Sequence, residues 1–202
     1  EEDKSFTEKQ LNAYLWMKQR LEEKGVQFSY YHCSNSAGII DVPEANMDLV
    51  RAGISIYGLY PSGEVNKANV PLKPALQWVS HVAHVKWVEA GTPVSYGGTY
   101  VTDRRTKLAT IPVGYGDGYP RSLSNKGYVL IKGQKAPIRG RVCMDQMMVD
   151  ITEIDDVAYE DQVILVGRDG EEELPVEVLS DLSGRFNYEF VCDIGKRVPR
   201  EF

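Results

Sequence analysis

The chain has 202 residues, enough to bury a substantial core in one large domain or two small ones. Its 23 Lys and Arg against 29 Asp and Glu give a net charge of −6 with no basic cluster, which argues against nucleic acid and anionic membranes as partners. No apolar run approaches the roughly 20 residues of a membrane span, and Cys33, Cys143 and Cys192 are too scattered for a disulfide framework. These features predict a globular protein of the reducing cytoplasm.

The first predicted element is a helix over residues 5–25, SFTEKQLNAYLWMKQRLEEKG. Ser5 with Glu8, and Thr7 with Gln10, have the spacing of a capping box, and Gly25 is a natural C-terminal stop. Apolar residues that share one face predict that this helix packs on another element; they are Phe6, Leu11, Tyr14, Leu15 and Leu21.

An α/β rhythm continues after this helix. A strand is predicted over residues 26–32, followed by a polar turn in SNSAG, a short helix over residues 44–50 and a second strand over residues 51–58. The alternation of helix and strand predicts a parallel arrangement.

From about residue 70 the chain consists of short β-rich runs separated by turn residues. The runs are LQWVSHVAHVKWV, TPVSYGGTYV, TKLATIPVGYG, GYVLIKGQKAPI, RVCMDQMMVDI and DQVILVG. A spacing of about ten residues predicts an all-β sandwich or barrel, and VEVLSDLSG predicts one late helix. The predicted fold class is therefore α/β plus β, with an α/β domain over residues 1–68 and a β-rich domain over residues 69–202.

Several motifs have both a structural and a functional interpretation. His81 and His84 would point to opposite faces of one strand, so we interpret them as strand residues rather than metal ligands. GYGDGYPR lacks the Lys-Ser/Thr of a P-loop, and its Tyr115 and Tyr119 fit a core or a pocket wall equally well. In VSYGGTY, Tyr96 either packs at a tight turn or points at a ligand.

Ser36, together with the N–H groups of Gly53 and Ile54, would suit a phosphate site. In (β/α)₈ barrels the loops after the last two strands often bind phosphate in this way. An ordinary Asn/Ser turn and a structural glycine would explain the same residues.

Taken together, the motifs resemble the alanine racemases from about residue 5 to residue 202, in order and with matching separations. They are HCSNSA, RAGISIYGLYPSG, LKPALQW, VSYGGTY, IPVGYGDGYPRSLSN, APIRGRVCMDQMMVDIT and NYEFVCDIGKRVPREF. The resemblance implies the last part of a (β/α)₈ barrel followed by a β-rich, barrel-like domain. It also implies a head-to-tail homodimer with shared sites and pyridoxal 5′-phosphate (PLP) as cofactor.

The same resemblance implies racemisation of L- and D-alanine by two bases, supplying D-alanine for peptidoglycan. It makes Tyr96 the second base, reaching into the partner subunit's barrel, and Met144 a contact of the substrate carboxylate. The implied PLP contacts are Ser36, Gly53, Ile54 and Tyr188 at the phosphate and Arg51 at the pyridine nitrogen. The implied access corridor is lined by Tyr115, Arg141 and Asp145.

These residue types suit the chemistry. Racemisation removes a proton from one face of Cα and returns one on the other, which requires a base on each side. A tyrosine serves as a base only where cations or hydrogen bonds lower its pKa well below about 10. Arginine keeps its proton, so at the pyridine nitrogen it would leave that nitrogen unprotonated and weaken the electron sink. The glycines after Tyr96 would let it project toward a neighbouring cofactor.

The sequence also departs from the family. The lysine that binds PLP covalently lies in a VKANAYGHG-like segment, which these 202 residues do not contain, so we expect a fragment that is inactive alone. One alternative is a racemase of serine or of broader specificity. Another is a non-catalytic module for dimerisation or binding, which would need none of Tyr96, Arg51 and Met144. PLP-linked decarboxylases are disfavoured because their glycine-rich phosphate loop and Cys-Glu-Ser motif do not occur.

Overall fold

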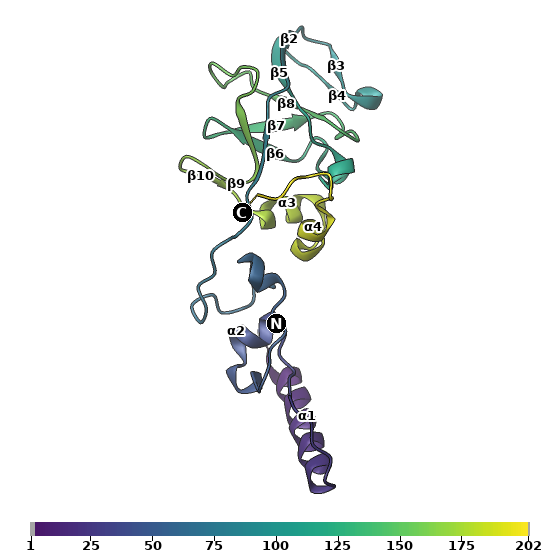
Figure 1. Cartoon of the computed structure of the whole chain (residues 1–202). Coiled ribbons are helices and arrows are strands. Elements are labelled where there is room, and N and C mark those ends of the chain that lie inside the picture. Colours follow the sequence, from purple (N-terminus) through teal and green to yellow (C-terminus); the bar gives the residue numbers. More distant parts are fainter. Residues whose placement is uncertain (1–2, 202) are drawn as a thin grey trace. The chain divides into compact units, whose positions relative to one another are not determined.

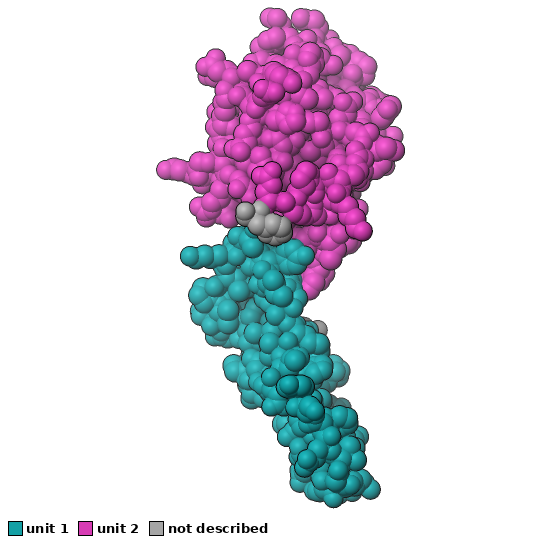
Figure 2. Space-filling view, in the orientation of Figure 1, with its two compact units in different colours: residues 1–75 teal, residues 76–202 magenta. Residues whose placement is uncertain are grey.

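The structure is a computed structural model that describes residues 3–201. It divides into two compact units, residues 1–75 and residues 76–202 (Figure 2). The predicted domain boundary between residues 68 and 69 lies a few residues before this division. Each unit has its own architecture, so each is described by itself.

Unit 1 begins with helix α1 (Ser5–Glu23), which confirms the predicted N-terminal helix. Gly25 follows it in the left-handed conformation, with φ of 77°, as expected for a C-terminal stop. The predicted capping boxes are wrong, because the N-cap residue is Lys4, with no side-chain cap, and Ser5 N–H donates instead to Asp3 Oδ1 (2.9 Å). The predicted apolar face is partly covered within the described chain: no residue of α1 is fully buried, Leu11, Tyr14 and Leu21 are half-buried, and Phe6 and Leu15 are exposed.

The two strands predicted in unit 1 do not form within the described residues. Residues 26–32 are irregular, and the centre of the predicted strand 51–58 is the 3-10 helix η2 (Ile54–Tyr57). A strand requires a repeating ladder to a neighbour. Here Asp48 N–H donates to Tyr31 O (3.1 Å), but this cross-link does not extend into a ladder.

The polar turn predicted in SNSAG is instead the start of helix α2 (Ser36–Asp41). Asn35 explains the difference, because its side-chain oxygen accepts the N–H of Gly38 (3.0 Å) and caps the helix. The helix predicted over residues 44–50 is reduced to the 3-10 turn η1 (Pro43–Ala45).

Unit 2 is rich in β-structure, as predicted. Its strands are β1 (Trp78–His81), β2 (His84–Val88), β3 (Pro93–Val94), β4 (Tyr100–Val101), β5 (Thr106–Ile111), β6 (Tyr128–Ile131), β7 (Gln134–Arg139), β8 (Met147–Asp150), β9 (Gln162–Asp169) and β10 (Glu172–Leu174). The main sheet has the order β1-β9-β6-β7-β8-β5-β2, with β10 paired to β9. Strands β3 and β4 form a separate hairpin beside it (Figure 1). Every strand pair within the described residues is antiparallel.

The core of unit 2 lies around β9, where Val163–Val166 are all buried. Consecutive buried residues mean that both faces of this strand are covered, because successive side chains point to opposite faces. Helix α3 (Val176–Ser183) confirms the predicted late helix and packs against α4 (Asn187–Asp193), which the sequence pattern does not predict (Figure 1).

His81 and His84 do not share a strand, contrary to the prediction. His81 ends β1 opposite Gln162, and His84 begins β2 opposite Thr110. The chain changes its partner between them: the N–H of the fully buried Val82 donates to Asp161 O (2.9 Å), whereas Ala83 N–H donates to Thr110 O of β5 (2.8 Å).

Tyr119 is fully buried in the core of unit 2, so its substitution should change stability. Its ring packs edge-on against Trp78, its hydroxyl is buried with no partner among the described residues, and burial raises its pKa. We expect Tyr119→Phe to keep or raise the free energy of unfolding in urea, because it removes an unpaired polar group. Tyr119→Ala should lower it by about 3–5 kcal/mol, since it leaves a cavity. A loss of more than about 1 kcal/mol in Tyr119→Phe would mean that the hydroxyl has a partner.

Candidate functional site

Strand register brings two loops of unit 2 to the same edge of the sheet. In the pairing of β5 with β8, Ile111 lies opposite Met147. The loop that leaves β5 at residue 112 therefore starts beside the loop of residues 140–146, which enters β8. The first loop carries Tyr115 and the second carries Met144.

Backbone hydrogen bonds join these loops. Tyr115 N–H donates to Cys143 O (2.9 Å), and Gly116 N–H donates to Met144 O (2.8 Å). Tyr115 and Met144 are 45% and 52% exposed. The structure thus fixes the backbones of two predicted site residues next to each other, with both side chains open to solvent.

Arg197 connects the same loops through charge. Its Nη2 donates to Asp145 Oδ1 (2.7 Å), and its Nε lies 3.4 Å from Asp117 Oδ1. Asp117 is buried, and its other oxygen accepts the N–H of Gly114 (3.0 Å). The hydrogen bond to Asp145 and the charge of Asp117 raise the pKa of Arg197. The predicted residue Asp145 is therefore one end of an ion-paired network.

Neither Arg197 nor Asp117 is among the residues predicted from the sequence. Asp117 follows Gly114 at the spacing of a local side-chain cap, a signal that could have identified it. Arg197 has no such local signal, because its partners lie far away in the sequence.

Tyr96 begins the 3-10 turn η3 (Tyr96–Gly98) directly after β3 and Ser95, and the residue is 72% exposed. Gly97 has φ of 73°, a left-handed conformation that residues with a Cβ rarely adopt. A Cβ at Gly97 would lie 3.5 Å from Cζ of Arg141, so the Arg141 guanidinium lies along this turn. Tyr96 and Arg141, two predicted site residues, are therefore on adjoining segments.

In unit 1 the predicted phosphate-binding residues lie together. Ser36 is buried, and its Oγ accepts the N–H of Gly53 (3.0 Å) and of Ser55 (3.4 Å). The Ser36 and Ser55 hydroxyls are 3.1 Å apart. Ile54, between these two donors, begins η2. The arrangement gathers hydroxyl and backbone N–H donors at one place.

Arg51 lies close to this group in the chain and contacts His32. Its Nη1 is 2.5 Å from His32 Nδ1, and its Nη2 donates to Cys33 O (3.3 Å). Because a guanidinium only donates, Nδ1 must be the acceptor. His32 is another residue that the sequence prediction does not include.

Tyr188 lies in helix α4 of unit 2, whereas the other predicted phosphate contacts lie in unit 1. Its ring stacks on Phe186, with 4.6 Å between the ring centroids and 9° between the planes.

Two family descriptions match the chain: alanine racemase, N-terminal domain, over residues 1–61, and alanine racemase, C-terminal domain, over residues 75–202. The chain belongs to the alanine racemase family. An alanine racemase of Desulforamulus reducens is 50% identical over 202 residues, covering all of this chain and 54% of that protein. One of Halothermothrix orenii is 48% identical and likewise covers all of this chain and 53% of that protein.

Solved structures of alanine racemases are similar to this chain over nearly its whole length. The enzyme of Clostridium difficile 630 in complex with cycloserine has a TM-score of 0.91 at 43% identity, covering 98% of this chain and 52% of that chain. The Bacillus anthracis enzyme with bound L-Ala-P has a TM-score of 0.91 at 38% identity, covering 98% and 51%. The chain thus spans about half the length of the racemases that it matches.

Within residues 3–201, no helix combines the length and the apolar character that a membrane span requires. No group of three or more His, Cys, Asp or Glu side chains in that range could hold a metal ion.

Because Asp117 accepts from Gly114 and pairs with Arg197, its substitution should change the stability of the chain. We expect Asp117→Asn to lower the free energy of unfolding by about 1–3 kcal/mol, because Gly114 N–H and Arg197 contact different oxygens of Asp117 and an amide has only one acceptor oxygen. Urea denaturation of the 202-residue chain measures this loss. The matched control is Asp155→Asn at an exposed position, which should stay within about 0.5 kcal/mol of the parent. Equal stability of the two variants would show that the network contributes nothing.

Proposed function

We propose that this chain forms part of a cytoplasmic PLP-dependent racemase that interconverts L-alanine and D-alanine and supplies D-alanine for peptidoglycan. The observation that carries the proposal is the match over all 202 residues, at 50% identity, to an alanine racemase. Unit 1 would contribute to the barrel that PLP would occupy.

The donor chemistry of unit 1 fits the phosphate of PLP. A phosphate offers only acceptor oxygens, and the Ser36 hydroxyl with the N–H groups of Gly53 and Ile54 would be its donors. The Tyr188 hydroxyl would be a further donor. In the present structure Gly53 N–H donates to Ser36 Oγ, so these two proposed donors lie 3.0 Å apart.

Arg51 would face the pyridine nitrogen. A guanidinium does not give up its proton, so the ring nitrogen opposite it would act as an acceptor and stay unprotonated. The contact of Arg51 with His32 leaves further N–H groups of the fork to donate. When bound, PLP supplies the electron sink that makes the substrate Cα–H acidic.

Tyr96 would hold or take the proton on one face of the substrate, with its hydroxyl oxygen as the acting atom. Its exposure and its position at the end of a strand support a role beyond packing. Met144 would contact the substrate carboxylate. Tyr115, Arg141 and Asp145 would line the corridor through which the amino acid enters.

A homodimer would combine the two halves of the site. Tyr96 and Met144 belong to unit 2, whereas Ser36 and Arg51 belong to unit 1. A twofold, head-to-tail pairing would let unit 2 of one subunit meet the barrel of the other. One alternative, a serine or broad-specificity racemase, would differ in the pocket for the substrate side chain. The other, a non-catalytic module, would not need Tyr96.

Substitution of Tyr96 tests the proposal in an assembled racemase, in which residues 1–202 replace the half of the Desulforamulus reducens enzyme that they match. We expect Tyr96→Phe to bind PLP normally but to lose about 10²–10⁴ in kcat, the usual contribution of one acid–base group. Absorbance of the bound cofactor and coupled assays in both directions measure this. Tyr159→Phe, at another exposed tyrosine, is the control and should keep full activity. Full activity of Tyr96→Phe would leave the tyrosine a packing residue.

Complementation tests the shared site. Ser36→Glu would repel the phosphate, and Tyr96→Ala would remove the base, so each homodimer should be inactive. In an equal, exchanging mixture about half of the dimers are heterodimers, each with one intact site, so activity should return to about a quarter of the parent value. If subunits exchange and no activity returns, Tyr96 serves its own subunit.

A further inference from the structure

Ser95, directly before Tyr96, has a strained backbone. Its φ is 62° and its ψ is −174°, a region that is almost exclusively populated by glycine because a Cβ meets the backbone there. Such conformations persist only where surrounding contacts fix them, and they cluster at functional sites. The unfavourable backbone conformation of Ser95 must therefore be stabilised by contacts with surrounding residues.

A hydrogen bond of the Ser95 side chain supplies the restraint. Its Oγ lies 2.7 Å from Arg141 O. Because a carbonyl only accepts, the Ser95 hydroxyl must donate its proton there. The Cys143 thiol lies 3.3 Å from Ser95 Oγ and 3.5 Å from Arg141 O, so its one proton has both oxygens as acceptors within reach. Both partners belong to the segment that enters β8, so this tether joins the Tyr96 turn to the main sheet.

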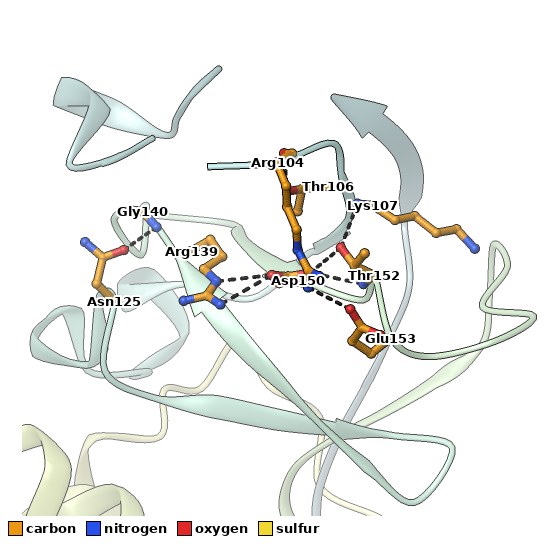
Figure 3. A network of polar contacts seen from close by, with 9 residues as sticks. All are labelled: Arg104, Thr106, Lys107, Asn125, Arg139, Gly140, Asp150, Thr152 and Glu153. Carbon is orange, nitrogen blue, oxygen red and sulfur yellow. Dashed lines mark hydrogen bonds and ion pairs between the residues drawn. The ribbon is translucent and has the colours of Figure 1, made fainter. Parts of the chain in front are cut away.

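The backbone on the far side of this contact is also fixed. A Cβ at Gly140 would lie 2.5 Å from Val94 O and 2.8 Å from Ser95 Cβ, so only glycine permits this close approach. Gly140 N–H donates to Asn125 Oδ1 (2.5 Å), as Figure 3 shows. Residue 95 therefore rests against a backbone that is itself anchored.

The second arm of the hairpin is held independently. The Arg139 guanidinium lies 4.7 Å from the ring centroid of Tyr100 in β4. Arg139 also pairs with Asp150 at 3.3 Å, and Asp150 accepts from the Thr152 hydroxyl at 2.6 Å (Figure 3). Both arms of the turn that carries Tyr96 are thus attached to the segment around residues 139–141.

We propose that Ser95 is a positioning residue whose hydroxyl, bound to Arg141 O, holds the strained backbone that directs the Tyr96 side chain. The proposal rests on the proposed catalytic role of Tyr96. Without the tether, residue 95 would relax to an ordinary φ and turn Tyr96 away, because the direction of a side chain follows its own backbone and that of its neighbour.

Two substitutions separate the tether from the strain. Ser95→Ala loses the hydroxyl but keeps the Cβ, whereas Ser95→Gly loses the hydroxyl and tolerates the conformation without being confined to it. In the 202-residue chain we expect Ser95→Ala to lower the folding equilibrium constant about tenfold, and Ser95→Gly to lower it less. At an ordinary position glycine is the more destabilising of the two.

The control is Ser122, whose hydroxyl also donates to a carbonyl (Ser183 O, 2.9 Å) but which is outside the positive-φ residues. There Ser122→Gly should be less stable than Ser122→Ala. If the Gly variant were also less stable than the Ala variant at Ser95, the backbone of Ser95 would not be strained. Hydrogen exchange of Gly98 N–H, which donates to Ser95 O (3.3 Å), should accelerate about tenfold in both Ser95 variants by the loss of one hydrogen bond. Unchanged exchange would overturn the tether, whatever the enzyme does.

The assembled racemase tests the positioning itself. We expect kcat to fall about 10–10²-fold in both Ser95 variants, because a displacement of about 1 Å at a reacting group has this effect, while PLP binding and KM change little. In Ser95→Gly this loss should occur with near-parental stability, which a purely structural role would not produce. Parental kcat in Ser95→Gly overturns the proposal. A fully active Tyr96→Phe would instead overturn the proposed function, and the exchange and stability results would still stand.

Discussion

Strand β8 lies between β5 and β7, and its pairing with both neighbours determines where the loops of unit 2 emerge. A slip of one residue would turn every side chain of the strand to the other face and place buried Met147 and Val149 in solvent. Because that register is enforced by burial, the loops that carry Tyr115, Met144 and Asp145 have little freedom to separate. The site of unit 2 is thus a consequence of core packing under the loops.

The residues on these loops are fixed by different interactions at increasing distance from the sheet. Next to the strands, backbone hydrogen bonds join residues 115 and 143, and further out Arg197 bridges two carboxylates. Unit 1 contrasts with this arrangement, since its predicted strands lack a ladder and its phosphate-binding candidates are joined through the Ser36 hydroxyl. Ion pairs that are open to water contribute little, so the buried Asp117 is the stronger part of the outer network.

The sequence predicts the elements of unit 2 well because alternation and turn residues are local signals, as in β6 and β7 around Lys132 and Gly133. It fails over residues 26–32 because a strand is defined by its neighbour, and the apolar pattern does not report whether one is present. The resemblance to alanine racemases supplied Tyr96 and Arg51. It could not supply Ser95 or Gly140, since neither a positive φ nor a close backbone approach is visible in residue type alone.

The position of β1 has a consequence for the order in which unit 2 folds. The β6–β7 hairpin is closed by two residues of positive φ, Lys132 and Gly133, and can form as soon as it is synthesised. Strand β1 can pair only after β9 has been synthesised, because residue 78 pairs with residue 166 near the end of the unit. Long-range antiparallel closure is slow, and Trp78, which becomes buried, stays exposed until then. During translation this strand is therefore a segment of unit 2 that depends on protection from aggregation.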